Sequence, residues 1–179
     1  MSLHPPRRVS DDDQRLMVLY TLSVLGPCTE LQLLQFLFEH DLMNYFDMMF
    51  ALNDLCAGGQ VMRVHQRIGF LYQLTEAGLE ALALFGSRIP MSLKTLLQSV
   101  SGDWKARFRQ ERQYQQEVRH TPRGEYELTL TVTEQDMDMM RLTLSLPNRE
   151  LCSQLTANWP KRAGEIYETV LRMLTEEKE

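Results

Sequence analysis

Hydrophobic residues in the first third of the chain recur every three to four positions, the spacing that places them on one face of an α-helix. Three such stretches follow one another, at residues 11–25, 30–41 and 45–57. Ser10 or one of the aspartates Asp11–Asp13 can cap the first helix, and Thr29 and Asn44 can cap the second and third. Gly26 and Gly58 stand where the first and third stretches end. The pattern predicts three helices joined by short turns, the arrangement of a helix-turn-helix core.

The apolar positions also predict which side of each helix is buried. In the second stretch, we expect the core-facing side to consist of Leu31, Leu34, Leu37 and Phe38. The third stretch can be assigned faces because a helix turns by about 100° per residue. With Leu52 at the centre, its buried side consists of Tyr45, Met48, Met49, Leu55 and Cys56.

The period changes after the third stretch. Residues 60–66 and 70–74 predict two strands, and the residues between them, 67–69, predict a tight turn. Thr75 can cap a following helix over residues 76–86. The inward face of that helix is expected to contain Leu79, Leu82, and Leu84 or Phe85.

The stretch from the third helix to this fourth one carries a resemblance. The residues that carry it are Leu52, Leu55, Gly58 or Gly59, Val61, Leu74, Thr75, Gly78 and Leu82. In these positions "LNDLCAGGQVMRV…GFLYQLTEAGLEAL" is similar to the third helix, wing and following helix of bacterial winged-helix transcription regulators, such as the multiple-antibiotic-resistance and phenolic-acid-response types. The resemblance covers residues 11–88 and implies a winged-helix domain. It specifies a fold more closely than a function.

Residues 89–122 read as a linking segment. An apolar pattern predicts a short helix over 91–100, and Gly102 is expected to interrupt it. Residues 103–120 are mostly polar and predict a second helix, whose thin apolar stripe includes Trp104 and Phe108.

The last third of the chain alternates between apolar and polar residues, as a half-buried strand does. Residues 125–133 and 140–146 predict a β-hairpin, which needs a cover over its apolar face. Asn148 can cap a helix over 149–158, and Trp159-Pro160 is expected to open another. The sequence therefore predicts an α+β fold.

These elements define an expected plan of the chain. It consists of a flexible tail at 1–10, a winged-helix domain at 11–88, linking helices at 89–122 and a small α+β domain at 123–179. In this order the whole chain also resembles a small uncharacterised bacterial family of predicted winged-helix regulators. That resemblance implies no ligand or target.

Composition narrows the classes of protein to consider. The chain of 179 residues is 44% hydrophobic and 24% charged, as in ordinary globular proteins. It contains no apolar run near the roughly 20 residues that span a membrane, and residues 1–14 lack the apolar core of a secretory signal. We therefore expect a cytoplasmic protein without membrane contact.

The sequence offers no pattern of catalytic or metal-binding residues. Cys28, Cys56 and Cys152 lie far apart, and the four histidines are isolated from one another. "CAGGQ" has two glycines but lacks the lysine and hydroxyl residue of a phosphate-binding loop. We expect a protein that is not an enzyme and binds neither a metal nor a cofactor.

The exposed side of the third helix is the first candidate site. Opposite Leu52 the helix is expected to present Phe46, Asp47, Phe50, Asn53, Asp54 and Ala57. No Lys or Arg occurs between residues 44 and 57, and a DNA-reading helix meets a dense line of phosphates. An apolar patch with an acidic rim is more typical of a protein contact, so Phe46, Asp47, Phe50 and Asp54 form a candidate protein interface.

Positive charge is placed elsewhere. Residues 91–123 carry seven Lys and Arg against three Asp and Glu, whereas the segments on either side are acidic. The candidate DNA-binding residues are Asn53 on the third helix, Arg63, His65, Gln66 and Arg67 at the wing, and Lys105, Arg109 and Arg112 on the linking helix. Related regulators insert a wing arginine into the minor groove, which is what the resemblance implies for Arg63 or Arg67.

Two functions remain open from the sequence. The first is a DNA-binding transcription regulator, and the second is a winged-helix module that binds a protein and has lost its DNA-binding face. In either case we expect a homodimer, formed through an edge strand of the C-terminal hairpin and the polar linking helix.

Overall fold

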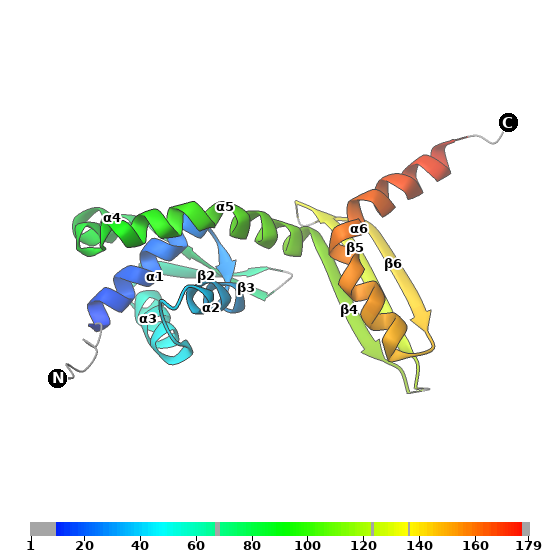
Figure 1. Ribbon diagram of the computed structural model, residues 1–179, viewed down its shortest axis with the longest axis horizontal. Coiled ribbons are helices and arrows are strands. Elements are labelled where there is room, and N and C mark those ends of the chain that lie inside the picture. The colour runs from blue at the N-terminus through cyan, green and yellow to red at the C-terminus, as the bar shows by residue number, and fades with distance from the viewer. Residues whose placement is uncertain (1–9, 67–68, 123, 136, 177–179) are drawn as a thin grey trace, which may run out of the picture. The chain divides into compact units, whose positions relative to one another are not determined.

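The computed structural model describes residues 10–66, 69–122, 124–135 and 137–176 of the chain. The protein is α+β, with helices and two antiparallel sheets (Figure 1). It divides into two compact units, unit 1 (Met1–Phe108) and unit 2 (Arg109–Glu179). In the part of the chain that is described, no helix is both long and apolar enough to cross a lipid bilayer.

Three helices open unit 1, and each starts after the capping residue that the sequence indicates. They are α1 (Asp11–Leu25), α2 (Glu30–Glu39) and α3 (Tyr45–Ala57). The side chains of Ser10, Thr29 and Asn44 each accept a hydrogen bond from the backbone N–H three residues further on. Gly26 ends α1 with a positive φ of 78°, which glycine adopts without strain. The predicted starts of all three helices are therefore confirmed, whereas α2 ends at Glu39, two residues before its predicted end at residue 41.

A three-stranded sheet follows from β1 (Cys28–Thr29), β2 (Val61–Gln66) and β3 (Gly69–Leu74). The strand order is β1-β3-β2, and both pairings are antiparallel. The hairpin of β2 and β3 confirms the predicted pair of strands. The two-residue strand β1 was not predicted. It forms through a tertiary contact with β3, and two residues are too few to show a strand pattern in the sequence.

Helix α4 (Glu76–Phe85), a short 3-10 turn η1 (Gly86–Arg88) and α5 (Met91–Gln113) complete the helices of unit 1. The Thr75 hydroxyl accepts from the Gly78 N–H and donates to the Gly59 carbonyl at 2.7 Å. This hydroxyl thus ties the start of α4 to the turn between α3 and β2.

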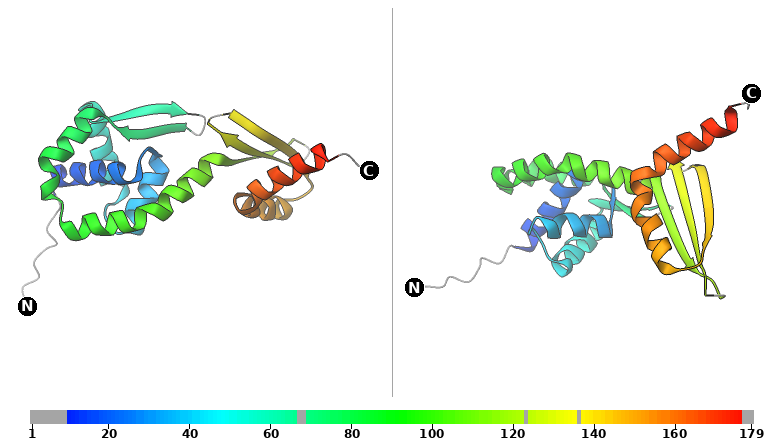
Figure 2. Two further views of the ribbon diagram at one scale, coloured as in Figure 1. Left: turned by 90° about the horizontal axis from the view of Figure 1, so that it is seen from above. Right: turned by 45° about the vertical axis from the view of Figure 1, so that its right-hand side comes forward.

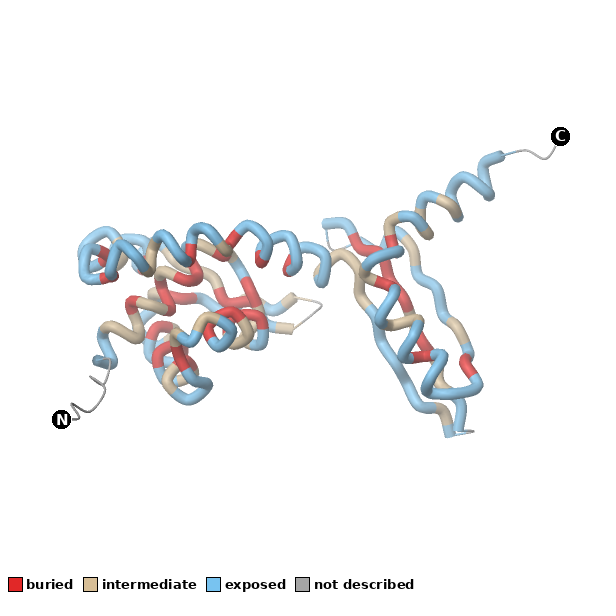
Figure 3. The backbone as a smooth tube through the Cα atoms, in the orientation of Figure 1, coloured by how far each residue is buried: buried red, intermediate tan, exposed pale blue. Residues whose placement is uncertain are grey.

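The core of unit 1 is formed by α1, α2 and α3 together with the first part of α5 (Figure 3). Its fully buried side chains include Val18, Leu33, Phe36, Leu37, Met48, Leu52 and Leu97. Trp104 and Phe108 of α5 join this core, since the Trp104 ring lies 5.4 Å from that of Phe36 and 5.5 Å from that of Phe108. The expected linking segment at 89–122 is therefore not separate, because α5 up to Phe108 belongs to unit 1.

Unit 2 is a second sheet with one long helix across it (Figure 2). The strands are β4 (Tyr114–His120), β5 (Tyr126–Glu134) and β6 (Met137–Leu146), in the order β4-β5-β6, and the helix is α6 (Arg149–Thr175). Leu128, Leu130 and Val132 of the central strand pack against Trp159 and Ala163 of α6. The small core of unit 2 thus has the predicted combination of hairpin and covering helix.

Two predictions for the middle of the chain are wrong. Helix α5 continues through Gly102, and it stops at Gln113 rather than extending to residue 120. Residues 114–120 form β4 instead, where Tyr114 and Val118 lie opposite Val132 and Leu128. A strand forms there because its pairing satisfies the backbone hydrogen-bonding groups along one edge of β5. A helix over these polar residues would leave that edge of β5 unpaired.

The second helix prediction for unit 2 is also wrong. A single helix, α6, runs through Pro160 instead of ending before it. Trp159 and Ala163, on either side of the proline, are both buried against the sheet. Pro160 provides no backbone N–H to the helical hydrogen bonds, and α6 changes direction between the part that lies on the sheet and its last turns (Figure 1).

Some predicted faces are rotated from those observed. Leu31 and Phe38 of α2 were expected inside but are 62% and 71% exposed, because Leu33, Phe36 and Leu37 point into the core. Tyr45 was expected inside as well and is 44% exposed. On α4 the residues predicted to face inward but found more than half exposed are Leu79, Leu84 and Phe85. An excess of apolar residues on these helices left their rotation ambiguous in the sequence.

Candidate functional site

Helix α3 is held in place by its inner side. Met48, Ala51, Leu52 and Leu55 are at most 3% exposed and pack within the core of unit 1. Because a helix face opposite a fully buried one must point outward, this packing fixes the rotation of α3. The side that carries Phe46 and Phe50 is therefore the outer side, as the sequence predicts.

Two phenylalanine rings dominate that outer side. Phe46 and Phe50 are each 69% exposed, and one turn of helix separates them. The Tyr45 ring meets Phe46 edge to face at 5.6 Å between ring centres. Asn53, one turn further along, is also exposed. The outer side is thus an aromatic ridge, which we define as Tyr45, Phe46 and Phe50.

The first of the two carboxylates beside this ridge serves the helix terminus. Asp47 accepts a hydrogen bond at 2.8 Å from the side-chain amide of Asn44, whose oxygen in turn caps the Asp47 N–H. A negative charge in the first turn of a helix is stabilised by the helix dipole. Asp47 therefore has a local structural partner, and it still contributes negative charge next to the ridge.

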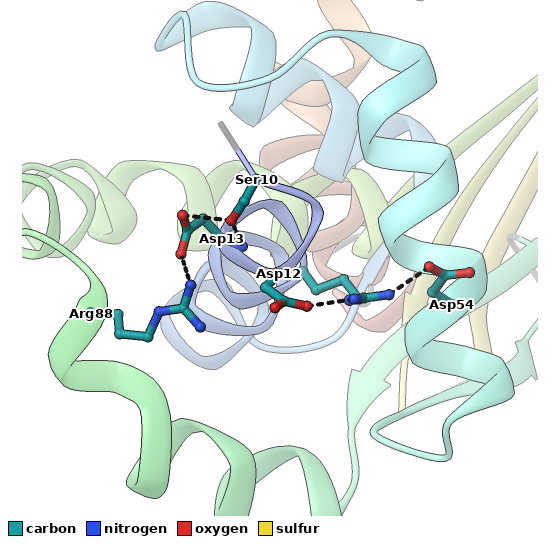
Figure 4. A network of polar contacts seen from close by, with 6 residues as sticks. Ser10, Asp12, Asp13, Asp54 and Arg88 are labelled. Carbon is teal, nitrogen blue, oxygen red and sulfur yellow. Dashed lines mark hydrogen bonds and ion pairs between the residues drawn. The ribbon is translucent and has the colours of Figure 1, made fainter. Parts of the chain in front are cut away.

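The second carboxylate has a partner on another helix. Arg15 of α1 donates to Asp54 at 2.8 Å and to Asp12 at 2.6 Å (Figure 4). The hydrogen bond from Arg15 and its positive charge hold the pKa of Asp12 below the ordinary value. In turn, the two carboxylates that Arg15 contacts raise the pKa of Arg15, Asp12 more than Asp54. One cation therefore serves two carboxylates, and the charge of Asp54 is partly offset.

Residue Arg88 makes a parallel contact to the start of α1. It donates to Asp13 at 2.5 Å, and the Ser10 hydroxyl donates to the same side chain at 2.7 Å (Figure 4). Arg15 and Arg88 both line a hollow of about 470 Å³ between α1, α3 and α4, and Leu16, Leu55 and Phe85 also line it. These ion pairs connect the first turn of α1 to α3 and to η1. None of them was predicted.

A further exposed ring lies next to the start of α3. Phe38, at the end of α2, lines a hollow of about 330 Å³ together with Asp41, Leu42, Met43, Asn44 and Asp47. Phe38 was expected inside the core, so its contribution to the surface is a finding of the structure. It extends the apolar surface from α3 towards the end of α2.

The β2–β3 hairpin presents the predicted wing residues around another exposed ring, that of Phe70. The Arg63 guanidinium lies 4.3 Å from the centre of the Phe70 ring, and His65 meets the same ring edge to face at 5.1 Å. Gln66 pairs with Gly69 at the end of the hairpin. Partial burial raises the pKa of Cys56 on α3, and the positive charge of Arg63 opposes that rise. Arg63 thus acts electrostatically on the end of α3.

The remaining predicted cations fall into different places. Arg67 lies outside the described residues. Lys105 is exposed on the part of α5 that belongs to unit 1, whereas Arg109 and Arg112 lie on the part that belongs to unit 2. The structure therefore brings together Arg63, His65 and Gln66 on one hairpin, and it brings Phe46, Asp47, Phe50, Asn53 and Asp54 together on one helix.

Sequence reasoning missed three contributors to this region. Arg15 and Phe38 come from other helices, and Phe70 lies on the strand opposite Arg63. The alternation of β3 could have placed Phe70 across from His65, but no sequence signal links Arg15 with Asp54. Across the described residues, no three His, Cys, Asp or Glu side chains gather as they would around a metal ion.

The described geometry defines an α+β protein whose N-terminal unit exposes an aromatic, acid-flanked helix. The chain belongs to the family described as domain of unknown function DUF4364, whose model matches residues 14–174. No curated protein and no solved structure matches the chain. The family match thus covers both units, and the family description names no activity.

Proposed function

We propose that unit 1 is a winged-helix module that binds a protein partner through the outer side of α3. Three features support the winged-helix assignment. The helices α1, α2 and α3 precede a β2–β3 hairpin, the short strand β1 pairs with β3 to complete a sheet, and α4 follows the hairpin. In such a module α3 takes the place of the recognition helix and the hairpin that of the wing.

The exposure of Phe46 and Phe50 is the observation that carries the binding function. Full burial of a phenylalanine side chain contributes roughly 1.5–3 kcal/mol, so two rings left 69% exposed represent a considerable gain for any partner that covers them. Aromatic side chains are also the residues most often found at the energetic centre of protein interfaces.

Charge defines the kind of partner. Asp47 and Asp54 flank the ridge, and α3 itself carries no Lys or Arg. A partner that fits this surface has an apolar pocket or groove for the two rings and Lys or Arg at its rim. Oppositely charged rims speed association and select the partner, while the rings supply most of the affinity.

A regulator that binds DNA is the second candidate. The β2–β3 hairpin supports it, because Arg63 and His65 are exposed there and could reach phosphates or a minor groove. The Arg15–Asp54 ion pair also supports it, since Arg15 offsets part of the negative charge that would face the DNA. The aromatic ridge opposes it, because rings on the outer side of α3 offer a phosphate backbone no cation.

Site-directed photocrosslinking tests the first candidate. A photoreactive phenylalanine analogue at position 50, in cells that make the protein naturally, should yield one discrete crosslinked polypeptide. The same analogue at Leu84, which is 73% exposed on α4, is the matched control and should not give that product. Replacing Asp47 and Asp54 by Lys should abolish the product at position 50. The absence of any product specific to position 50 would argue against the proposal.

A salt-dependent binding assay with mixed-sequence duplex DNA tests the second candidate. A regulator should bind at low salt and lose affinity steeply as salt rises, and Arg63→Ala should reduce both the affinity and the salt slope. If wild-type protein shows no binding at low salt, the DNA-binding candidate is excluded. If Phe50→Asp leaves DNA binding unchanged while Arg63→Ala weakens it, the hairpin rather than α3 is the contact.

A further inference from the structure

The hollow between α1, α3 and α4 has the size of a small-molecule site. Its volume of about 470 Å³ lies within the range of roughly 300–1,000 Å³ that ligand pockets occupy. Its apolar lining includes Leu16, Leu19 and Leu55, which are at most 5% exposed, and the ring of Phe85, which is 53% exposed. A ligand in the hollow would therefore rest on buried leucines and cover an aromatic ring that the protein itself leaves in water.

The charges that border the hollow do not balance. Asp12 and Asp54 both contact Arg15. Asp13 contacts Arg88 (Figure 4). Three carboxylates thus share two guanidinium groups, which leaves one negative charge in excess in this network. An anionic ligand would have to displace a carboxylate from an arginine, whereas a cationic ligand would meet a carboxylate that shares its arginine with another.

Helix dipoles place the excess charge at Asp54. Asp12 and Asp13 lie in the first turn of α1, where the partial positive charge of the helix end stabilises carboxylates. Asp54 lies in the last turn of α3, where the partial charge is negative, and that turn contains no Lys or Arg. Gly58, at the end of α3, also lines the hollow. The end of α3 therefore presents to the hollow both a carboxylate and a negative helix terminus, and both favour a cation.

We propose that this hollow binds a small organic cation with an apolar body. The cationic nitrogen contacts the Asp54 carboxylate, and the hydrocarbon or aromatic part lies on the buried leucines. The Gln60 side chain lies over Gly58 and also lines the hollow, where its amide oxygen can accept a hydrogen bond from a protonated amine. The Phe85 ring completes the site, because the face of an aromatic ring attracts cations as well as apolar groups.

The inference goes beyond the proposed function and does not rest on it. Among the described residues, Asp54 belongs both to the flank of the aromatic ridge and to the lining of the hollow, whereas Tyr45, Phe46 and Phe50 lie outside that lining. A crosslink at position 50 and a ligand in the hollow are therefore separate observations, and either can fail without the other.

Calorimetric titration of the full chain tests the proposal with three probes that share a phenyl ring on a four-carbon chain. At neutral pH phenylbutylamine is cationic, phenylbutanol is neutral and phenylbutyrate is anionic. The amine should bind about fivefold more tightly than the alcohol, which corresponds to one exposed ion pair, and the carboxylate should bind more weakly than either. Tighter binding of the carboxylate, no preference for the amine, or no binding of the amine at millimolar concentration would overturn the proposal.

Four variants locate the site on the protein. Asp54→Asn should remove the preference for the amine and leave the affinity for the alcohol unchanged. Asp47→Asn, in the first turn of the same helix and outside the lining of the hollow, is the matched control and should leave all three affinities unchanged. Phe85→Ser should weaken the binding of amine and alcohol alike, whereas Phe50→Ser, which also removes an exposed ring, should weaken neither. Retention of the amine preference in Asp54→Asn would place the cation elsewhere and overturn the proposal.

The chain itself contains the competing occupant. Arg7 and Arg8 precede the start of α1 and lie outside the described residues. A variant with both arginines replaced by Gln should bind the amine as the wild type does. If the amine binds only to this variant, the chain's own arginines take the place of the ligand in the wild type, and the proposal is overturned.

Discussion

Arg15 on α1 donates to Asp54 on the outer side of α3 at 2.8 Å, across 39 positions of the sequence. The same guanidinium holds Asp12 at 2.6 Å. This contact alters the charge of the candidate site from outside the helix that forms it. It also explains how a helix without Lys or Arg carries two carboxylates on its outer side without leaving both of them unpaired.

The first prediction concerns the affinity of the α3 surface. Arg15→Gln removes the cation next to Asp54 and leaves the outer side of α3 more acidic. We expect tighter binding of a partner with a basic rim, and weaker binding if the ligand is DNA, by a few-fold in either case because exposed ion pairs are weak. Measuring the affinity of wild type and Arg15→Gln for the crosslinked partner and for duplex DNA would show whether the substitution tightens or weakens binding. Arg119→Gln, which removes a cation from an exposed ion pair in unit 2, is the matched control.

The second prediction concerns pH. Arg15 lowers the pKa of Asp12 below its ordinary value of 3.8 in the folded protein. A carboxyl group whose folded pKa is depressed contributes stability above its unfolded pKa, and this contribution is lost as pH falls through the folded pKa. In Arg15→Gln, the pKa of Asp12 should rise towards its ordinary value. A carboxyl NMR titration measures this shift directly.

The control for that titration is Arg119→Gln, which removes a cation from unit 2. It should leave the titration of Asp12 unchanged. An Asp12 titration identical in wild type and Arg15→Gln would mean that the ion pair is not formed in solution. The difference in stability between wild type and Arg15→Gln should disappear at pH values well below 3.8.

The third prediction contrasts two helical glycines. A side chain at Gly78 in α4 would overlap the backbone carbonyl of Gln60, whereas nothing lies within 4 Å of a side chain at Gly102 in α5. Gly102→Ala should therefore stabilise the protein by about 0.5–1 kcal/mol, the usual gain in a helix interior. Gly78→Ala should destabilise it, because the close approach outweighs that gain. Urea unfolding distinguishes the two signs, and stabilisation by Gly78→Ala would contradict the observed packing.

The fourth prediction separates binding from folding on neighbouring helices. Phe50→Ser should change the free energy of unfolding by less than about 0.5 kcal/mol, because the ring is 69% exposed. Phe36→Ala should lower it by about 3–5 kcal/mol, because that ring is fully buried. Thermal and urea unfolding of both variants provide the comparison. A large loss of stability in Phe50→Ser would mean that the ring is not on the surface.

The fifth prediction concerns the contact between α6 and β4. The Trp159 indole is 2% exposed and donates to the Gln115 carbonyl at 3.1 Å. Trp159→Phe keeps an aromatic ring but leaves that carbonyl without this donor, so unit 2 should lose about 1–3 kcal/mol. Amide hydrogen exchange should accelerate in β4 more than in β6. Equal acceleration in both strands would indicate that the lost volume matters and the hydrogen bond does not.

Local signals in the sequence determined the starts of α1, α2, α3 and α4 and the strands of the β2–β3 hairpin. Ser10, Thr29, Asn44 and Thr75 cap the helices that follow them, because a short polar side chain satisfies a backbone N–H within three residues. The outer position of Phe46 and Phe50 was likewise determined, since the more buried residues of α3 fix its rotation. The caps and the rotation of α3 depend on residues that are close in the chain, so a local sequence pattern is enough to predict them.

Tertiary structure alone decided the rest. Residues 114–120 are polar and were predicted as helix, but they form β4 because the edge of β5 offers backbone partners. Leu31 and Phe38 are outside because three other apolar residues of α2 fit the core better. Arg15 reaches Asp54 only because α1 packs against α3. In each case the residues that decide the outcome are distant in the sequence. A periodic pattern cannot show which distant group will pair with a strand edge, fill a core position or neutralise a charge.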